Sequence, residues 1–253
     1  MLDDFLTLNV FHFILVFARL GSTMMFLPGF SATYVTMQAR LSLALAITIA
    51  VLPLLSPLLP AMPDSAAELV RLFILEITIG IFLGSLVNVI TTALHLAGTV
   101  IGITGGLMNA MVFDPITAQQ GAMVIGLLSM ISLVLIFTLG LHGLMLKAVI
   151  DSYGLFVPGQ VPMSGDMIAM LRDVMNDAAH VGLRLASPFI VFAMVFEVAM
   201  GILVRLAPQW NIFFVALPLK LTLGLGLLMI VLPAMMLSYL SYFENVLEGF
   251  LAG

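Results

Sequence analysis

Long runs of apolar residues, separated by short polar breaks, dominate the chain. A helix that crosses the ~30 Å hydrocarbon core of a bilayer needs ~20 apolar residues. Six runs reach that length or nearly so, at residues 5–27, 41–59, 69–97, 122–150, 185–205 and 212–237. Because no stretch alternates with the period of two expected of barrel strands, the pattern predicts an all-α, polytopic membrane protein.

One further stretch, residues 166–181, shows apolar positions at helical spacing with polar residues between them, which predicts an amphipathic helix. Residues 60–66 and 151–165 are rich in proline, glycine and polar residues and predict loops. Prolines within or beside the apolar runs predict kinked helices arranged as short hairpins. We expect a single domain over residues 1–253.

Composition agrees with a membrane protein, since 62% of the 253 residues are hydrophobic and only 8% are charged. The net charge of −5 gives no basic surface for nucleic acid or for anionic lipid. The absence of cysteine excludes disulfides and thiolate chemistry. The four histidines are scattered, and motifs typical of metalloproteases, phosphate loops and serine nucleophiles are missing, so we expect no cofactor, no metal site and no enzymatic activity.

Four charged residues lie inside the apolar runs, where a central charge costs roughly 3 kcal/mol on insertion. They are Arg19, Glu76, Glu197 and Lys220. Glu197 and Lys220 lie equally far from the turn at residues 207–210, so an antiparallel hairpin would bring them to the same height. There they would neutralise each other or share one polar layer in an assembly. Glu76 has no evident partner. For Arg19 and Arg205 the alternative is snorkelling near a helix end.

The centre of the chain combines glycines with soft apolar side chains. Gly98 and Gly102, four residues apart, allow a second backbone to approach closely. Gly105-Gly106 predicts the end of a helix and Asp114-Pro115 predicts a turn. The hydrophobic connection that results, residues 106–119, is expected to act as a plug or constriction, because irregular backbone at membrane depth is tolerated only against protein or a lumen. The candidate gating residues are Gly106, Leu107, Met108, Asn109, Met111, Phe113, Asp114, Pro115 and Gln119. The alternative for each methionine is ordinary core packing.

Several segments resemble the FliR family of type III export-gate subunits, over essentially the whole chain. The most specific is Gly201-Ile-Leu-Val-Arg205-Leu-Ala-Pro208-Gln209-Trp210-Asn211-Ile-Phe213-Phe-Val-Ala-Leu-Pro218-Leu-Lys220. Supporting matches are Arg19-Leu-Gly21, Pro28, Arg40-Leu-Ser-Leu-Ala44-Leu with Pro53, Phe113-Asp114-Pro115 and Pro158-Gly159.

The resemblance implies a subunit of the flagellar export gate in the bacterial inner membrane. Family members combine with FliP-like and FliQ-like subunits in a helical assembly, beside FlhB-like and FlhA-like export components, and unfolded flagellar proteins pass through it. The central loop would then be the plug of the closed pore. Assembly and turn residues would be Arg19, Arg40, Glu76, Glu197, Arg205, Pro208, Gln209, Asn211, Pro218 and Lys220.

Three alternatives remain open at this stage. The chain could serve a virulence type III secretion system, or it could be a membrane-embedded scaffold without a role in conduction. A small-solute transporter would need an internal repeat around a polar site at the midplane, and the embedded charges here are scattered instead.

Overall fold

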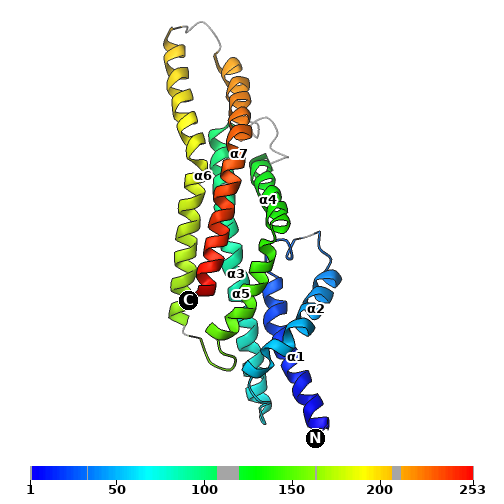
Figure 1. Cartoon of the computed structure of the whole chain (residues 1–253). Helices are drawn as coiled ribbons and strands as arrows, with labels where there is room; N and C mark the ends of the chain where they lie inside the picture. Colours follow the sequence, from blue (N-terminus) through cyan, green and yellow to red (C-terminus); the bar gives the residue numbers. More distant parts are fainter. Residues whose placement is uncertain (1, 33, 107–119, 163, 207–211, 253) are drawn as a thin grey trace. The chain divides into compact units, whose positions relative to one another are not determined.

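The structure is a computed structural model that describes residues 2–32, 34–106, 120–162, 164–206 and 212–252. Every regular element in these ranges is a helix (Figure 1), which confirms the predicted all-α class. The elements are α1 (Leu2–Met24), α2 (Met37–Leu55), the short 3-10 helix η1 (Ser56–Leu58), α3 (Ala66–Thr104), α4 (Gln120–Thr138), α5 (Leu141–Leu155), α6 (Ser164–Leu206) and α7 (Ile212–Ala252).

Several helices are long and apolar enough to cross a bilayer, so the chain is a multi-pass membrane protein. Within the described residues, four segments qualify on their own: Met37–Leu58, Ala66–Thr104, Gly165–Leu206 and Phe214–Phe250. Met123–Thr138 and Leu141–Leu155 qualify only when they are counted together, and Val10–Met24 is a shorter apolar helix.

Three features of the helices differ from the sequence prediction. Residues 151–155, predicted as part of a loop, form the end of α5, and the loop begins only at Phe156. The amphipathic stretch 166–181 and the apolar stretch 185–205 form one continuous helix, α6, which runs through Gly182, where the missing side chain allows close contact with α3. The apolar run 122–150 is divided instead into α4 and α5 at Gly140, whose φ of 77° lies in the left-handed region that favours glycine. The predicted break at Gly105-Gly106 is confirmed, since α3 ends at Thr104 and Gly106 has a φ of 78°.

The helices divide into two compact units, each built from segments that are distant in the sequence. Unit 1 consists of Met1–Ile90, Phe137–Met175 and Glu244–Gly253, and unit 2 consists of Thr91–Ile136 and Asn176–Phe243. The single domain expected from the sequence remains a prediction.

In unit 1, α1 and α3 approach closely at two glycines of α3. A Cβ atom at Gly84 would lie 2.7 Å from both the Thr23 carbonyl oxygen and the Phe26 Cβ of the α1 segment. A Cβ atom at Gly80 would collide with the Ser22 hydroxyl and the Arg19 carbonyl oxygen. Small residues at such a crossing are typical of helix packing in membranes, where dispersion contacts replace the hydrophobic effect. The α1–α3 distance is therefore set by these two glycines.

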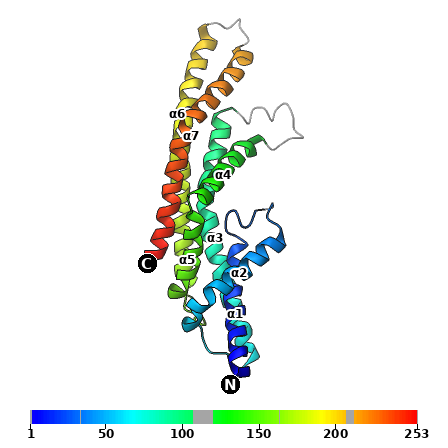
Figure 2. The same cartoon turned by 45° about the vertical axis from the view of Figure 1, so that its right-hand side comes forward.

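Unit 2 uses glycine in the same way. A Cβ atom at Gly98 of α3 would lie 2.9 Å from the Ile125 Cα of α4, as the spacing of Gly98 and Gly102 predicted for Gly98. At Gly182 of α6 it would lie 2.7 Å from the Ala93 carbonyl oxygen of α3. In this unit α6 and α7 run side by side as an antiparallel pair, which both views show (Figures 1 and 2).

The close packing at these glycines predicts that Gly→Ala substitution will lower the stability of the protein, whereas it usually raises stability inside a helix. Glycine to alanine inside a helix normally stabilises by roughly 0.5–1 kcal/mol. Gly84→Ala should instead destabilise the protein by about 1–3 kcal/mol. The added methyl group would overlap the Thr23 carbonyl oxygen and the Phe26 Cβ, and neither atom can move away unless the backbone moves with it. Thermal unfolding of the purified full chain in detergent measures the difference.

Gly126→Ala is the matched control, because it lies inside α4 and a Cβ atom there meets nothing within 4 Å. It should be neutral or stabilising in the isolated chain. Equal behaviour of the two variants would contradict the close α1–α3 crossing.

Candidate functional site: the embedded charges

Arg19 of α1 and Glu76 of α3 form a buried ion pair in unit 1. The Arg19 Nε donates to Glu76 Oε2 at 2.6 Å, and Nη2 donates to Oε1 at 3.1 Å. Both side chains are 0% exposed. The two parallel bonds match the fork of a guanidinium to the two oxygens of a carboxylate, which makes this geometry stronger and more specific than a single contact.

The Arg19 guanidinium also donates hydrogen bonds to α5 and to the residue that follows it. Nη1 donates to the Ser152 hydroxyl at 3.2 Å, and Nη2 also donates to the Phe156 carbonyl oxygen at 2.9 Å. The guanidinium carbon lies 3.8 Å from the centre of the Tyr153 ring, a cation–π contact. One guanidinium therefore joins α1, α3 and the end of α5.

These contacts correct two sequence-based interpretations. Snorkelling is wrong for Arg19, because its side chain is fully buried, and Glu76 has a partner after all. The pairing was missed because 57 positions separate the two residues and they lie on different helices. The available signal was that two opposite charges each stood alone in an apolar run. Ser152, Tyr153 and Phe156 carried no signal that we used.

Glu197 of α6 and Lys220 of α7 make the contact that their distance from the turn predicted. The Lys220 Nζ donates to Glu197 Oε1 at 3.2 Å, and it lies 5.9 Å from the centre of the Phe196 ring. The two partners differ in burial, since the Lys220 side chain is 13% exposed and that of Glu197 is 70% exposed. The single contact with the Lys220 ammonium therefore leaves most of the Glu197 side chain exposed.

The surface around this pair is apolar. Met194 and Val198 flank Glu197 on α6, Leu219 and Leu223 flank Lys220 on α7, and all four side chains are exposed. We call these six residues the hairpin face. A carboxylate in the middle of exposed hydrocarbon side chains is costly in lipid and stable against a partner that brings a donor.

The predicted plug, residues 106–119, lies outside the described residues except for Gly106. The helix ends that flank it are held within unit 2. Gly98 of α3 packs against Ile125 of α4. The end of α3 has a second contact, because a Cβ atom at Gly224 of α7 would lie 3.4 Å from the Gly105 carbonyl oxygen. The helices on both sides of residues 107–119 are therefore packed.

The remaining predicted assembly residues have diverse positions. Arg40 donates through Nε to the Phe30 carbonyl oxygen at 2.8 Å and through Nη2 to that of Ala32 at 3.3 Å, so it holds the turn before α2. Arg205 and Pro218 are exposed on α6 and α7. Pro208, Gln209 and Asn211 lie outside the described residues. In the part of the chain that the structure describes, no three His, Asp or Glu side chains are grouped as a metal site would require.

Removal of one member of the buried ion pair should destabilise unit 1 strongly. Glu76→Leu leaves the Arg19 charge buried without its carboxylate, and we expect a loss of about 3–5 kcal/mol. The double variant Arg19→Met with Glu76→Leu removes both charges and should recover most of that loss. Thermal unfolding of the full chain in detergent measures all three proteins. A double variant no more stable than the single one would contradict the pairing.

The sequence is similar to known proteins over most of its length. It is 32% identical over 236 residues to the flagellar biosynthetic protein FliR of Caulobacter vibrioides, which covers 93% of this chain and 94% of that protein. The FliR of Escherichia coli is 30% identical over 208 residues, 81% of this chain and 78% of that protein. The surface presentation of antigens protein SpaR of Salmonella typhimurium is 26% identical over 204 residues, 81% of this chain and 76% of that protein.

A family pattern covers nearly the whole chain as well. The family described as bacterial export proteins, family 1, matches residues 10–246, a range that includes Arg19, Glu76, Glu197 and Lys220. Both ion pairs therefore lie within the matched region. Together with relatives of 30% identity or more over most of the length, this match shows that the chain belongs to the bacterial export proteins, family 1.

Proposed function

We propose that this chain is a non-enzymatic subunit of the flagellar type III protein export gate in the bacterial inner membrane. With FliP-like and FliQ-like partners, and beside FlhB-like and FlhA-like components, it forms the pore through which unfolded flagellar proteins leave the cell. The relatives named above support the flagellar role, since the two with the higher identity are flagellar biosynthetic proteins. The match to SpaR is weaker, at 26% identity.

The hairpin face is the observation that carries this proposal. Its apolar side chains alone could be covered by lipid, but the Glu197 carboxylate in their midst could not without a cost of roughly 3 kcal/mol at the bilayer centre. Another polypeptide can cover both, with apolar side chains and with a hydrogen-bond donor opposite Glu197. The geometry therefore favours a subunit in an assembly over an isolated membrane protein.

The plug role of residues 106–119 is part of the proposal. It is supported by the composition of the segment and by the packed helix ends on either side, which would fix where a short connection can reach. Soft methionine side chains suit a seal that must yield when cargo passes, because they adapt their shape readily.

Neutralising Glu197 should disrupt assembly while it leaves the chain itself folded. We expect Glu197→Leu to lower recovery of FliP-like and FliQ-like subunits with the tagged full chain at least about tenfold, since truncation of one member of a buried interfacial charge pair costs about 2–5 kcal/mol. Co-purification followed by mass determination of the intact complex measures the effect.

Glu248→Leu is the control, because Glu248 is another exposed carboxylate of α7 that lies outside the hairpin face. It should leave recovery unchanged. Wild-type recovery with Glu197→Leu would count against the proposed interface.

Deletion of residues 106–119 tests the plug directly. Gates that carry the deletion should conduct ions in the resting state, whereas gates with the intact chain should stay closed. Conductance of the purified complex in planar bilayers is the measurement. Unchanged conductance, with the complex fully assembled, would favour a scaffold without a role in conduction. Saturable uptake of a small solute by vesicles that contain this chain alone would favour a transporter.

A further inference from the structure

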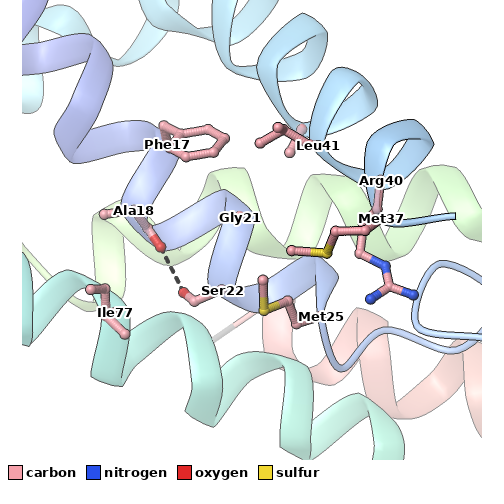
Figure 3. A pocket seen from close by; sticks show the side chains of 10 residues that line it. Phe17, Ala18, Gly21, Ser22, Met25, Met37, Arg40, Leu41 and Ile77 are labelled. Carbon is pink, nitrogen blue, oxygen red and sulfur yellow. Dashed lines mark hydrogen bonds between the residues drawn. The ribbon is translucent and has the colours of Figure 1, made fainter.

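A cavity lies within unit 1 where α1, α2 and α3 meet (Figure 3). Its volume is about 290 Å³. Apolar groups from all three helices and from the end of the α1 segment line it, among them Phe17, Gly21, Met25, Met37, Leu41 and Ile77. Methionine side chains adapt to irregular occupants better than branched ones, so the two here suit a flexible ligand.

The Ser22 hydroxyl in the cavity wall needs no ligand, because its hydrogen bond is made within α1. The Ser22 hydroxyl donates to the Ala18 carbonyl oxygen at 2.7 Å, the bond drawn in Figure 3, and its oxygen also lies 3.0 Å from the Arg19 carbonyl oxygen. An occupant therefore gains nothing from polar atoms there and gains dispersion contacts from methylene groups. The interior selects for hydrocarbon.

Arg40 gives the cavity a single positive charge. Its guanidinium uses Nε and Nη2 on the carbonyl oxygens of Phe30 and Ala32, which fixes its position without neutralising it. Among the residues that the structure describes, no carboxylate lies within ion-pair distance of it. The side chain is half-buried and belongs to the cavity lining, so a bound anion could reach its remaining N–H groups.

The position of Arg40 along α2 matches the level of lipid headgroups. It lies in the first turn of α2, and the apolar residues of a membrane-length segment follow it up to Leu58. Basic residues at the end of a spanning helix lie at the interface, where phosphate groups are found. Exposed Leu43, Ile49 and Leu54 of α2 provide apolar surface for further acyl contact.

We propose that this cavity binds an anionic phospholipid, with one acyl chain between α1, α2 and α3 and the phosphate on the Arg40 guanidinium. The site concerns a lipid ligand and does not depend on the proposed export function. It is also compatible with the net charge of −5, because one fixed guanidinium beside a fitted apolar cavity replaces a broad basic surface.

The test uses the full chain in vesicles of phosphatidylcholine with a minority of phosphatidylglycerol that carries a photoreactive acyl chain. Irradiation should label residues of the cavity wall, with Met25 and Met37 as the sites to map by mass spectrometry. Gly21→Leu should reduce labelling about tenfold, because a Cβ atom there meets only the Phe17 ring at an ordinary 3.6 Å and the leucine then fills the cavity. Arg40→Gln should lower the preference for phosphatidylglycerol over phosphatidylcholine about fivefold.

Gly143→Leu is the matched control, since a Cβ atom at this exposed glycine of α5 meets nothing within 4 Å. Equal thermal unfolding of the three variants and the wild type shows that folding is not the cause of lost labelling. Labelling that stays at the wild-type level in Gly21→Leu would overturn the proposal. So would absence of lipid from the cavity in the co-purified complex together with crosslinks from the same residues to another subunit, which would identify a polypeptide as the occupant.

Discussion

A permanently charged guanidinium inside an apolar helical unit needs hydrogen-bond acceptors around it, and Arg19 makes four hydrogen bonds to groups of α3, of α5 and of the residue after α5. The carboxylate of Glu76, the Ser152 hydroxyl and the Phe156 carbonyl oxygen receive its hydrogen bonds, and the Tyr153 ring covers its carbon. Removal of any one helix would leave a buried charge exposed to hydrocarbon. The glycines at positions 80 and 84 bring α3 close enough for the pair to form.

The ion pair of unit 2 is exposed, unlike the buried pair of unit 1. The exposed pair lies at the surface, with Lys220 largely covered and Glu197 largely open. The two ion pairs differ in how far their charges are exposed. The buried pair lies in the interior of one unit, whereas the open pair leaves most of a carboxylate exposed among apolar side chains, which is why we propose a subunit interface there. A single chain therefore carries one charge pair that is enclosed by its own fold and one that stays open at the surface.

The sequence predicted helices well because the length of an apolar run sets the number of turns that a bilayer can hold, whatever the neighbours are. It also predicted the Glu197–Lys220 contact, since a short hairpin fixes the register of its two arms. The Arg19–Glu76 pair was beyond such reasoning, because the crossing of two separate helices depends on packing. Gly140 was missed for a related reason: glycines also occur inside helices, as Gly126 and Gly182 do here, and the left-handed conformation depends on tertiary context.

Unit 1 is built from segments that are distant in the sequence, and this has a consequence for biosynthesis. Arg19 and Ser152 are 133 positions apart, so a ribosome that adds ~5–20 residues per second delivers the second group on the order of ten seconds after the first. The unit also includes Glu244–Gly253, so it closes only after that segment has been made. During that interval the nascent amino-terminal helices hold a guanidinium whose acceptors have not all been made. An unpaired guanidinium is costly in hydrocarbon, so we expect the amino-terminal helices to reach their final packing only after Phe156 has been made.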